Sequence, residues 1–261
     1  MATNATTYPV IVLIHGSWHF PSHYSTFTTQ LRERGHEVHA PRLPTMNGAR
    51  PPTADLETDS DFIRAYVEGL VSAGREVIVL MHSYGGQVGT NALAGLGRPT
   101  RQAQGLAGGV VHLVYINAFA VVEGTSMADV VEAHGNSDLM PLAFDFAKDQ
   151  TVMSRDFKKL IVGPGRPDDE TDAYIAAFRP HNGKAWYDKI QHCAWREVPR
   201  ITYIQTTLDM NVPIHYQKKM VETLEKEGKQ VTACELETGH CPTFTMPEEV
   251  AKIVHELAVE N

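Results

Sequence analysis

The sequence predicts an α/β fold: a doubly wound, mostly parallel sheet with helices on both faces. Apolar, β-branched segments alternate with amphipathic segments over residues 8–120 and again over 198–261. The composition, with 43% hydrophobic and 21% charged residues in 261, is that of an ordinary globular chain. Residues 121–197 interrupt the alternation. We therefore expect one core made of residues 1–120 and 198–261, with 121–197 inserted as a cap.

The first half of the core contains three strand patterns, each followed by a helix pattern. Continuous apolar runs of the kind found in buried parallel strands predict strands at 8–15 and 75–83, and a second, short strand is predicted at 37–44, where it runs into a Pro-rich loop. Helical spacing of apolar residues predicts helices at 27–36 and 55–74, and a helix of small residues that can pack close to the sheet is predicted at 85–97. The second of these helices begins with acidic residues and ends at Gly74, which suits the helix dipole and a glycine stop.

The second half continues the pattern on either side of the insertion. Strands are predicted at 109–120, 201–209 and 231–240, and helices at 214–228 and 247–260. The segment 121–197 holds helix-like pieces and loops rich in Gly and Pro. An insertion between two sheet strands is expected to cover the carboxyl edge of the sheet, where open α/β sheets bind ligands.

Composition excludes several classes of function. The net charge of −8 disfavours general binding to phosphate backbones, so no nucleic-acid partner is expected. No apolar run approaches the ~20 residues that span a bilayer, so no membrane partner is expected. The N-terminal residues lack a basic segment and an apolar core, which favours a cytoplasmic protein. Three Cys without a C-x-x-C pattern disfavour a disulfide framework or a zinc site.

A sharp turn from strand to helix is predicted at Ser83. The strand 75–83 leads into Met-His-Ser-Tyr-Gly-Gly, which matches the nucleophile-elbow pattern G-x-S-x-G except at Met81. Such a turn needs small residues around its apex, because neighbouring backbone comes close. Gly85 and Gly86 meet that need on the helix side. Ser83 is therefore the candidate nucleophile.

Two further strand ends supply the groups that a nucleophilic serine needs. A serine hydroxyl is a weak nucleophile until a base removes its proton. His240 follows the last predicted strand and is the candidate base, and Asp209 follows the preceding strand and would orient it. The chain order Ser83, Asp209, His240 is the order that this strand–turn–helix pattern has in hydrolases.

Backbone amides beside Ser83 could hold the negative charge of a tetrahedral intermediate. The first strand ends in a loop that begins at His15 and contains Ser17. We assign the oxyanion hole to the Ser17 N–H and to the N–H of Tyr84, the residue after the nucleophile.

These motifs resemble the α/β-hydrolase superfamily, and more narrowly the branch of plant methylesterases and hydroxynitrile lyases. The resemblance spans nearly the whole chain and is weakest in the cap; it rests on H-G-x-x-H (15–19), H-S-Y-G-G (82–86), V-Y-I-N-A-F (114–119), the strand end at Asp209 and G-H (239–240). It implies a sheet of about eight strands, a small, mainly helical cap and no cofactor. It also implies the roles given above for the five site residues. Because the branch often dimerises, a homodimer is an expectation.

Two departures from the family pattern bear on the chemistry. The hydroxynitrile lyases of this branch place a Lys after the catalytic His, whereas this chain has Cys241, which disfavours cyanohydrin cleavage. Met81 stands where the elbow has a small residue, so it either tilts the nucleophile or repacks. C–C cleavage, cyclisation or decarboxylation with the same residues stays open, as does a small-ligand-binding protein with slow turnover.

Metal and dinucleotide sites are disfavoured. His15, His19 and His23 are spaced by four, but Gly16 and Pro21 interrupt any helix that would bring them together on one face. A dinucleotide site would need G-x-G-x-x-G after the first strand, and this strand ends in HGSWHF. Neither a metal nor a cofactor is therefore expected.

The expected substrate is a small apolar compound. Apolar residues near the turn and in the cap predict a hydrophobic pocket, and we assign substrate contacts to Trp18, His19, Phe119 and Trp186. His19 has an equally good interpretation as a packed loop residue. The sequence thus predicts a cofactor-independent serine hydrolase of secondary metabolism that cleaves a small ester, lactone or thioester through an acyl-enzyme.

Overall fold

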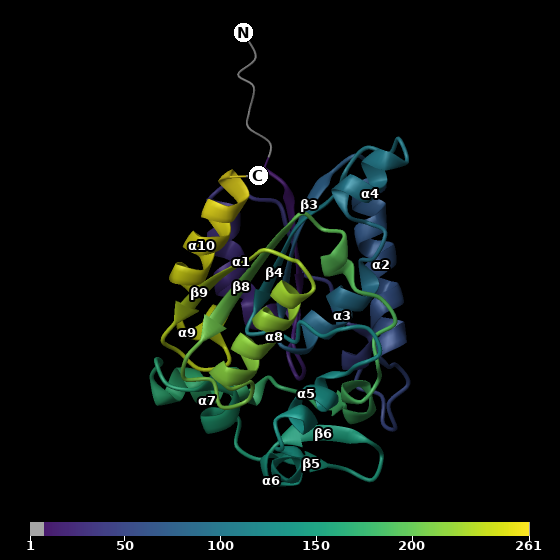
Figure 1. The fold of residues 1–261 in the computed structure, drawn as a ribbon. Coiled ribbons are helices and arrows are strands. Elements are labelled where there is room, and N and C mark those ends of the chain that lie inside the picture. Colours follow the sequence, from purple (N-terminus) through teal and green to yellow (C-terminus); the bar gives the residue numbers. More distant parts are fainter. Residues whose placement is uncertain (1–7, 261) are drawn as a thin grey trace.

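A six-stranded parallel sheet forms the centre of the molecule (Figure 1). The computed structural model describes residues 8–260. Residues 1–7 and 261 lie outside the described part, and the expectation of a cytoplasmic protein rests partly on residues 1–7. The strand order is β2-β1-β3-β4-β8-β9, and all neighbours are parallel. The strands are β1 (Val10–Ile14), β2 (Val38–His39), β3 (Glu76–His82), β4 (Gly109–Ile116), β8 (Arg200–Thr206) and β9 (Val231–Leu236).

Helices cover both faces of this sheet. Alternate residues of β1 point to opposite faces, so Ile11 and Leu13 pack with α1 (Ser25–Glu33) and α10 (Pro247–Val259). Val10, Val12 and Ile14 belong to the larger core on the other face. That core is closed by α2 (Leu56–Ser72), α3 (Tyr84–Ala92) and α8 (Ile214–Lys226). Two further helices are short: α4 (Arg98–Ala103) precedes β4, and α9 (Pro242–Thr245) packs Phe244 against the larger core.

The predicted fold class is confirmed, and the sheet has six strands where about eight were expected. The six observed strands correspond to the six segments whose residue pattern predicts a strand. The larger number came from the family resemblance alone. The remaining segments of the described chain form helices, loops and the inserted region, so the described residues contain no further strand for this sheet.

The chain between β4 and β8 builds a layer at the carboxyl ends of the strands (Figure 1). Its helices are α5 (Met127–Ala133), α6 (Met140–Ala143) and α7 (Asp168–Ala176). It is mainly helical, as expected, and it also contains a small antiparallel sheet formed by β5 (Phe144–Phe146), β6 (Thr151–Ser154) and β7 (His181–Asn182). These strands have two to four residues, too few for a clear alternating pattern.

Short 3-10 and π turns connect the elements. They are η1 (Pro21–Tyr24), η2 (Pro44–Met46), η3 (Ser137–Leu139), η4 (Phe157–Val162), η5 (Gly183–Trp186) and η6 (Ala194–Arg196). Among residues 8–260, no helix is both long enough and apolar enough to cross a membrane.

Candidate active site

Ser83 occupies the sharp turn between β3 and α3. Its backbone has φ 55° and ψ −123°, a conformation that non-glycine residues rarely adopt and that is typical of strained functional turns. The turn presses α3 against neighbouring backbone. A Cβ at Gly85 would lie 2.3 Å from the Ile14 carbonyl oxygen, and one at Gly86 would lie 2.7 Å from the Phe119 nitrogen. Both positions therefore require glycine.

Met81 is accommodated without loss of this turn. The side chain is fully buried in the core beneath α3. A Cβ at Gly89 would lie 2.4 Å from the Met81 sulfur, so the missing side chain on the helix provides the room. The large side chain on the strand thus faces a glycine on the helix. Of the two predicted consequences of Met81, a tilted nucleophile or local repacking, the structure shows repacking.

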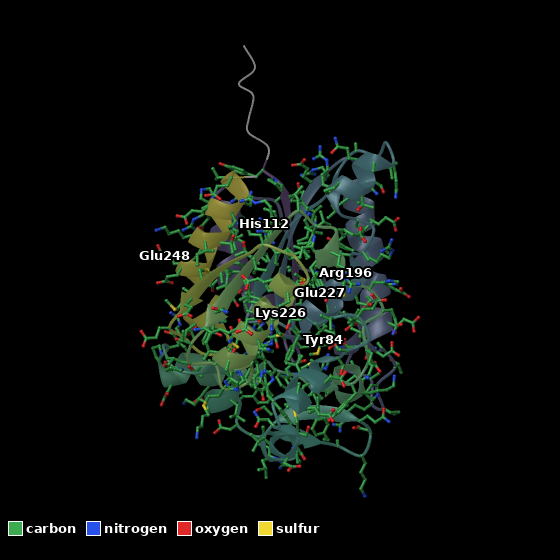
Figure 2. The ribbon with its side chains drawn as sticks, viewed as in Figure 1. Tyr84, His112, Arg196, Lys226, Glu227 and Glu248 are labelled. Carbon is green, nitrogen blue, oxygen red and sulfur yellow. The ribbon has the colours of Figure 1, made fainter. Side chains whose placement is uncertain are left out.

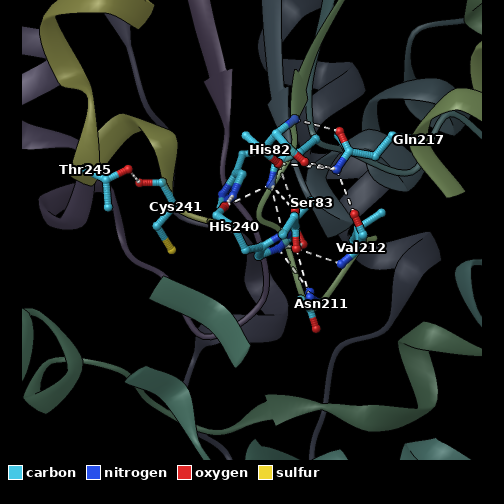
Figure 3. A network of polar contacts seen from close by, with 12 residues as sticks. His82, Ser83, Asn211, Val212, Gln217, His240, Cys241 and Thr245 are labelled. Atoms are coloured by element: carbon cyan, nitrogen blue, oxygen red, sulfur yellow. Dashed lines mark hydrogen bonds and ion pairs between the residues drawn. The ribbon is translucent and has the colours of Figure 1, made fainter. Parts of the chain in front are cut away.

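Ser83, His240 and Asp209 form one continuous hydrogen-bonded chain (Figure 3). The His240 Nε2 lies 2.8 Å from the Ser83 Oγ, and its Nδ1 lies 2.7 Å from the Asp209 Oδ2. With the Nδ1 proton directed to the carboxylate, Nε2 is free to accept the serine proton. All three residues are at most 5% exposed. The structure brings together the three residues that the sequence predicts.

The Asp209 carboxylate is fixed by donors on both of its oxygens. The Asn211 and Val212 amides donate to Oδ1, each at 2.8 Å. The Thr206 hydroxyl donates to Oδ2 at 3.0 Å. The Gln217 side chain braces this loop through both the amide and the carbonyl of Thr206. Such hydrogen bonds stabilise the ionised form of a buried carboxylate.

Asn117 is a site residue that sequence reasoning missed. It follows β4, has φ 35°, and its Nδ2 donates to the Asp209 Oδ2 at 3.0 Å and to the His240 carbonyl at 2.9 Å. It therefore ties the acid and the base to the end of a third strand. The sequence did contain a signal for Asn117: it is a polar residue at the end of an apolar strand. It lies within the motif V-Y-I-N-A-F, which was used above only for the family resemblance.

His82 and Tyr24 join three loops behind the nucleophile. Burial lowers the pKa of His82 to about 3, so the ring is neutral. Its Nε2 donates to the His240 carbonyl at 2.7 Å, and its Nδ1 accepts from the Tyr24 hydroxyl at 2.7 Å. The same hydroxyl accepts from the Gly16 amide at 3.1 Å. The loop after β1, the turn at Ser83 and the His240 loop are thereby held in register.

The backbone amides of Ser17 and Tyr84 lie at loop and helix starts, as the sequence predicts. Neither donates any of the loop and cap hydrogen bonds that the described residues make to one another. Tyr84 is the first residue of α3, where N–H groups have no partner within the helix. The Ser17 hydroxyl accepts from the Trp186 indole at 3.1 Å, which links this loop to the cap.

A buried carboxylate anchors the side chain of Tyr84. Asp59 accepts hydrogen bonds from the Tyr84 hydroxyl at 3.0 Å and from the Thr45 hydroxyl and amide. Desolvation nevertheless raises the pKa of Asp59 to about 7. The Tyr84 ring thus points away from Ser83 toward α2. Thr45 continues the network to His181 of the cap at 3.2 Å.

An apolar pocket opens beside Ser83. It encloses about 110 Å³ and includes three of the four predicted substrate contacts, Trp18, Phe119 and Trp186. His19 is not among the lining residues, because it packs against Phe178 and its Nε2 faces the Cys241 sulfur at 3.6 Å. The cap supplies ten of the eighteen lining residues; they include Met140 and Phe144, which were candidates for an apolar wall, and Met127, Val131 and Leu139, which the sequence did not single out.

Asn211 brings an amide to the reactive end of this pocket. Its Nδ2 lies 3.0 Å from the His240 Nε2, so it shares that nitrogen with the Ser83 hydroxyl. Cys241 is fully buried, and burial raises the pKa of its thiol, so it contributes no charge. Within residues 8–260, no cluster of three or more His, Cys, Asp or Glu could hold a metal ion.

The fold, the strained serine turn and the hydrogen-bonded Ser–His–Asp chain define a hydrolase-type α/β protein. The chain belongs to the alpha/beta hydrolase family, which it matches over residues 11–253.

Individual relatives and solved structures are similar over nearly the full length. The chain is 29% identical to a probable hydrolase, R7, of Phoma sp., covering 97% of this chain and 99% of that protein. It is 26% identical to a pyrethroid hydrolase of Sphingobium wenxiniae, covering 95% and 87%. The structure of an extracellular alpha/beta-hydrolase from a Paenibacillus species has a TM-score of 0.74 at 19% identity, covering 96% and 99%. Polyneuridine aldehyde esterase has a TM-score of 0.72 at 19% identity, with the same coverage.

Proposed function

We propose that this protein is a serine hydrolase that cleaves a small apolar carboxylic ester, lactone or thioester through an acyl-enzyme. The observation that carries the proposal is the 2.8 Å contact between the Ser83 Oγ and the His240 Nε2, at a strained turn that opens into an apolar pocket. Relatives named hydrolase and pyrethroid hydrolase support a hydrolytic reaction.

The first half of the reaction forms the acyl-enzyme. The Ser83 Oγ attacks the carbonyl carbon while its proton passes to the His240 Nε2. The amides of Ser17 and Tyr84 bind the oxyanion, and Asp209 stabilises the imidazolium. The bond from the carbonyl carbon to the leaving oxygen or sulfur then breaks, and His240 returns the proton to that atom.

The second half releases the acid. A water molecule attacks the acyl carbon, and His240 accepts its proton as general base. The tetrahedral intermediate collapses, the bond to the Ser83 Oγ breaks, and His240 gives the proton back to the serine. With a lactone the alcohol and the acid leave as one molecule.

Neutral, apolar substrates suit the pocket best. Its lining residues include no Asp, Glu, Lys, Arg or His. An ionised substrate buried there would lose hydration without gaining a counter-charge. Where hydroxynitrile lyases of the related branch carry Lys, this site has the neutral, buried thiol of Cys241. Ester hydrolysis needs no cation at that place, whereas cyanide release would benefit from one.

The test is a panel of activated esters, methyl esters and lactones assayed with the wild type and with Ser83→Ala. The variant should lose at least about 10,000-fold in kcat, since the nucleophile of an acyl-enzyme pathway cannot be bypassed. A fluorophosphonate should label the wild type at Ser83 and leave the variant unlabelled. Substantial turnover by Ser83→Ala would instead indicate a lyase or cyclase that uses His240 as a base. No turnover and no labelling of the wild type would indicate a ligand-binding protein.

A further inference from the structure

Two polar side chains meet in the wall of the otherwise apolar pocket, one from the cap and one from the core. Asn136 immediately precedes η3, and Tyr216 lies in the first turn of α8. The Asn136 Nδ2 donates to the Tyr216 hydroxyl oxygen. Both residues line the same pocket as Ser83. The pocket therefore has a second polar point besides the group around His240.

The Tyr216 ring is held in one position. The residue is 3% exposed, and its ring stacks on that of His134 at 3.9 Å with an interplanar angle of 22°. The ring of His215 packs edge-on at 4.8 Å. The His134 Nδ1 donates to the Val130 carbonyl at 2.7 Å, which fixes that ring in turn. A tyrosine fixed before the ligand arrives loses little conformational entropy on binding.

The Asn136–Tyr216 pair retains an unused donor. In the described residues the Tyr216 hydroxyl accepts from Asn136 and donates to no protein atom. Rotating the Asn136 amide by 180° would let the hydroxyl donate to Oδ1, and the amide N–H groups would then be unused. In either arrangement the pair can offer a hydrogen bond to an acceptor on a ligand.

The character of the pocket selects the kind of acceptor. None of the lining residues carries a charge, so an ionised acceptor would be buried without a counter-ion. A neutral ketone, ester or ether oxygen would gain a hydrogen bond and leave no charge uncompensated.

We propose that the Asn136–Tyr216 pair is a second recognition point, which binds a neutral oxygen acceptor that the substrate carries away from its scissile carbonyl. This inference rests on the proposed hydrolase function and narrows its substrate class. The substrate is then an apolar ester, lactone or thioester with at least one further ketone, ester or ether oxygen. The alternative role of the pair, to fasten the cap onto α8, makes no distinction between substrates.

The experiment compares plain and keto substrates of equal length. The probes are 4-nitrophenyl octanoate and its analogues with a ketone at each carbon from the fourth to the seventh. A second set carries the ketone in the alcohol half of octyl acetate. The readout is the ratio of kcat/KM for each keto ester to that for the plain ester. The wild type should prefer one keto position by about 5- to 30-fold, the range of one good hydrogen bond.

Variants show whether that preference comes from the pair. Tyr216→Phe combined with Asn136→Leu should bring the ratio close to one. Tyr115→Phe is the matched control and should keep the ratio, because Tyr115 is also buried but bonds Thr90 outside the pocket. Equal rates for all esters with the wild type would overturn the proposal. So would an unchanged ratio in the double variant.

A binding measurement separates this inference from the proposed reaction. Calorimetric titration of Ser83→Ala with the same esters needs no turnover. The favoured keto ester should bind about 5- to 30-fold more tightly than the plain ester, and the double substitution should abolish the difference. If no ester is hydrolysed but this difference is found, the recognition point stands and the hydrolase proposal fails. If esters are hydrolysed but bind with equal affinity, the hydrolase proposal stands and the recognition point fails.

Discussion

Buried histidines should make this fold unstable in mild acid. Five of them are at most 1% exposed and have pKa values far below 6.5, in each case chiefly through desolvation. The values are about 4 for His15 and His112, about 3 for His82 and His181, and well below 6.5 for His19. The unfolded chain therefore binds more protons than the folded chain once the pH falls below about 6.5.

The size of the effect follows from linkage. Between about pH 7 and pH 5, each histidine that is protonated only in the unfolded state removes about 2 kcal/mol of folding free energy, or about 9 kcal/mol for the five. Asp59 acts in the opposite direction. Its folded pKa of about 7 lies above the ordinary 3.8, so protonation on acidification returns about 2 kcal/mol. The net loss is about 7 kcal/mol, comparable with the whole stability of a typical domain.

The assay is urea unfolding at about pH 7, 6 and 5, followed by tryptophan fluorescence and far-UV circular dichroism. The free energy of unfolding should fall most steeply near pH 5, by about 5 kcal/mol per pH unit. A total change below about 2 kcal/mol between pH 7 and pH 5 would refute the reasoning, because it would mean that the buried rings are protonated in the folded state.

Matched variants isolate the histidine contribution. His112 lies in β4 and forms a hydrogen bond with Thr202. Figure 2 shows it well away from the cap, whereas Tyr84 lies on the cap side of the sheet. His112→Gln should flatten the pH dependence near pH 5 by about one proton, or about 1.4 kcal/mol per pH unit. The exposed residue His192 serves as the control, and His192→Gln should leave the slope unchanged.

Three substitutions test the packing and the polar supports of the site. Gly86→Ala should lower the free energy of unfolding, measured in urea, by about 3 kcal/mol, because the new Cβ would lie within 3 Å of backbone atoms. The control is Gly69→Ala in α2, where the space is open, and it should raise the free energy of unfolding by up to about 1 kcal/mol. Equal effects of the two substitutions would contradict this account. Asn117→Ala should lower kcat about 10- to 100-fold with little change in KM, since it loosens the acid and base; an effect on KM alone would argue against that role. Tyr84→Phe should cost about 1–3 kcal/mol of stability at about pH 8, where Asp59 is ionised, and less near pH 5.5; a cost that does not change with pH would be inconsistent with it.

Local patterns in the sequence were enough to predict the scaffold and the three polar residues that meet at its edge. Apart from β2 and α9, the strands and helices of the core are five to seventeen residues long, and most are long enough to be recognised without tertiary contacts. In a parallel sheet the carboxyl ends of the strands share one edge. Assigning Ser83, Asp209 and His240 to such ends therefore placed them together before any distance was known.

Only the tertiary structure decided what surrounds those groups. The bond between Tyr24 and His82 joins residues 58 positions apart, and the contact between Asn117 and His240 spans 123. No local pattern records such pairs. The effect of Met81 likewise depended on Gly89, whose missing side chain leaves room for the Met81 sulfur once α3 packs on the sheet. The pocket wall followed the same rule, because the short elements of the cap take their positions from packing rather than from periodicity.

The sequence by itself thus determined the order of the elements and the strand ends at which Ser83, Asp209 and His240 meet. It could not determine that His19 packs behind the pocket, or that Asn136 and Tyr216 meet within it. The physical reason is that reactive residues here stand at the ends of regular strands, whose positions periodicity predicts. The pocket wall comes from side chains whose neighbours are distant in the chain, and these neighbours are set only by the packing of the cap on the core.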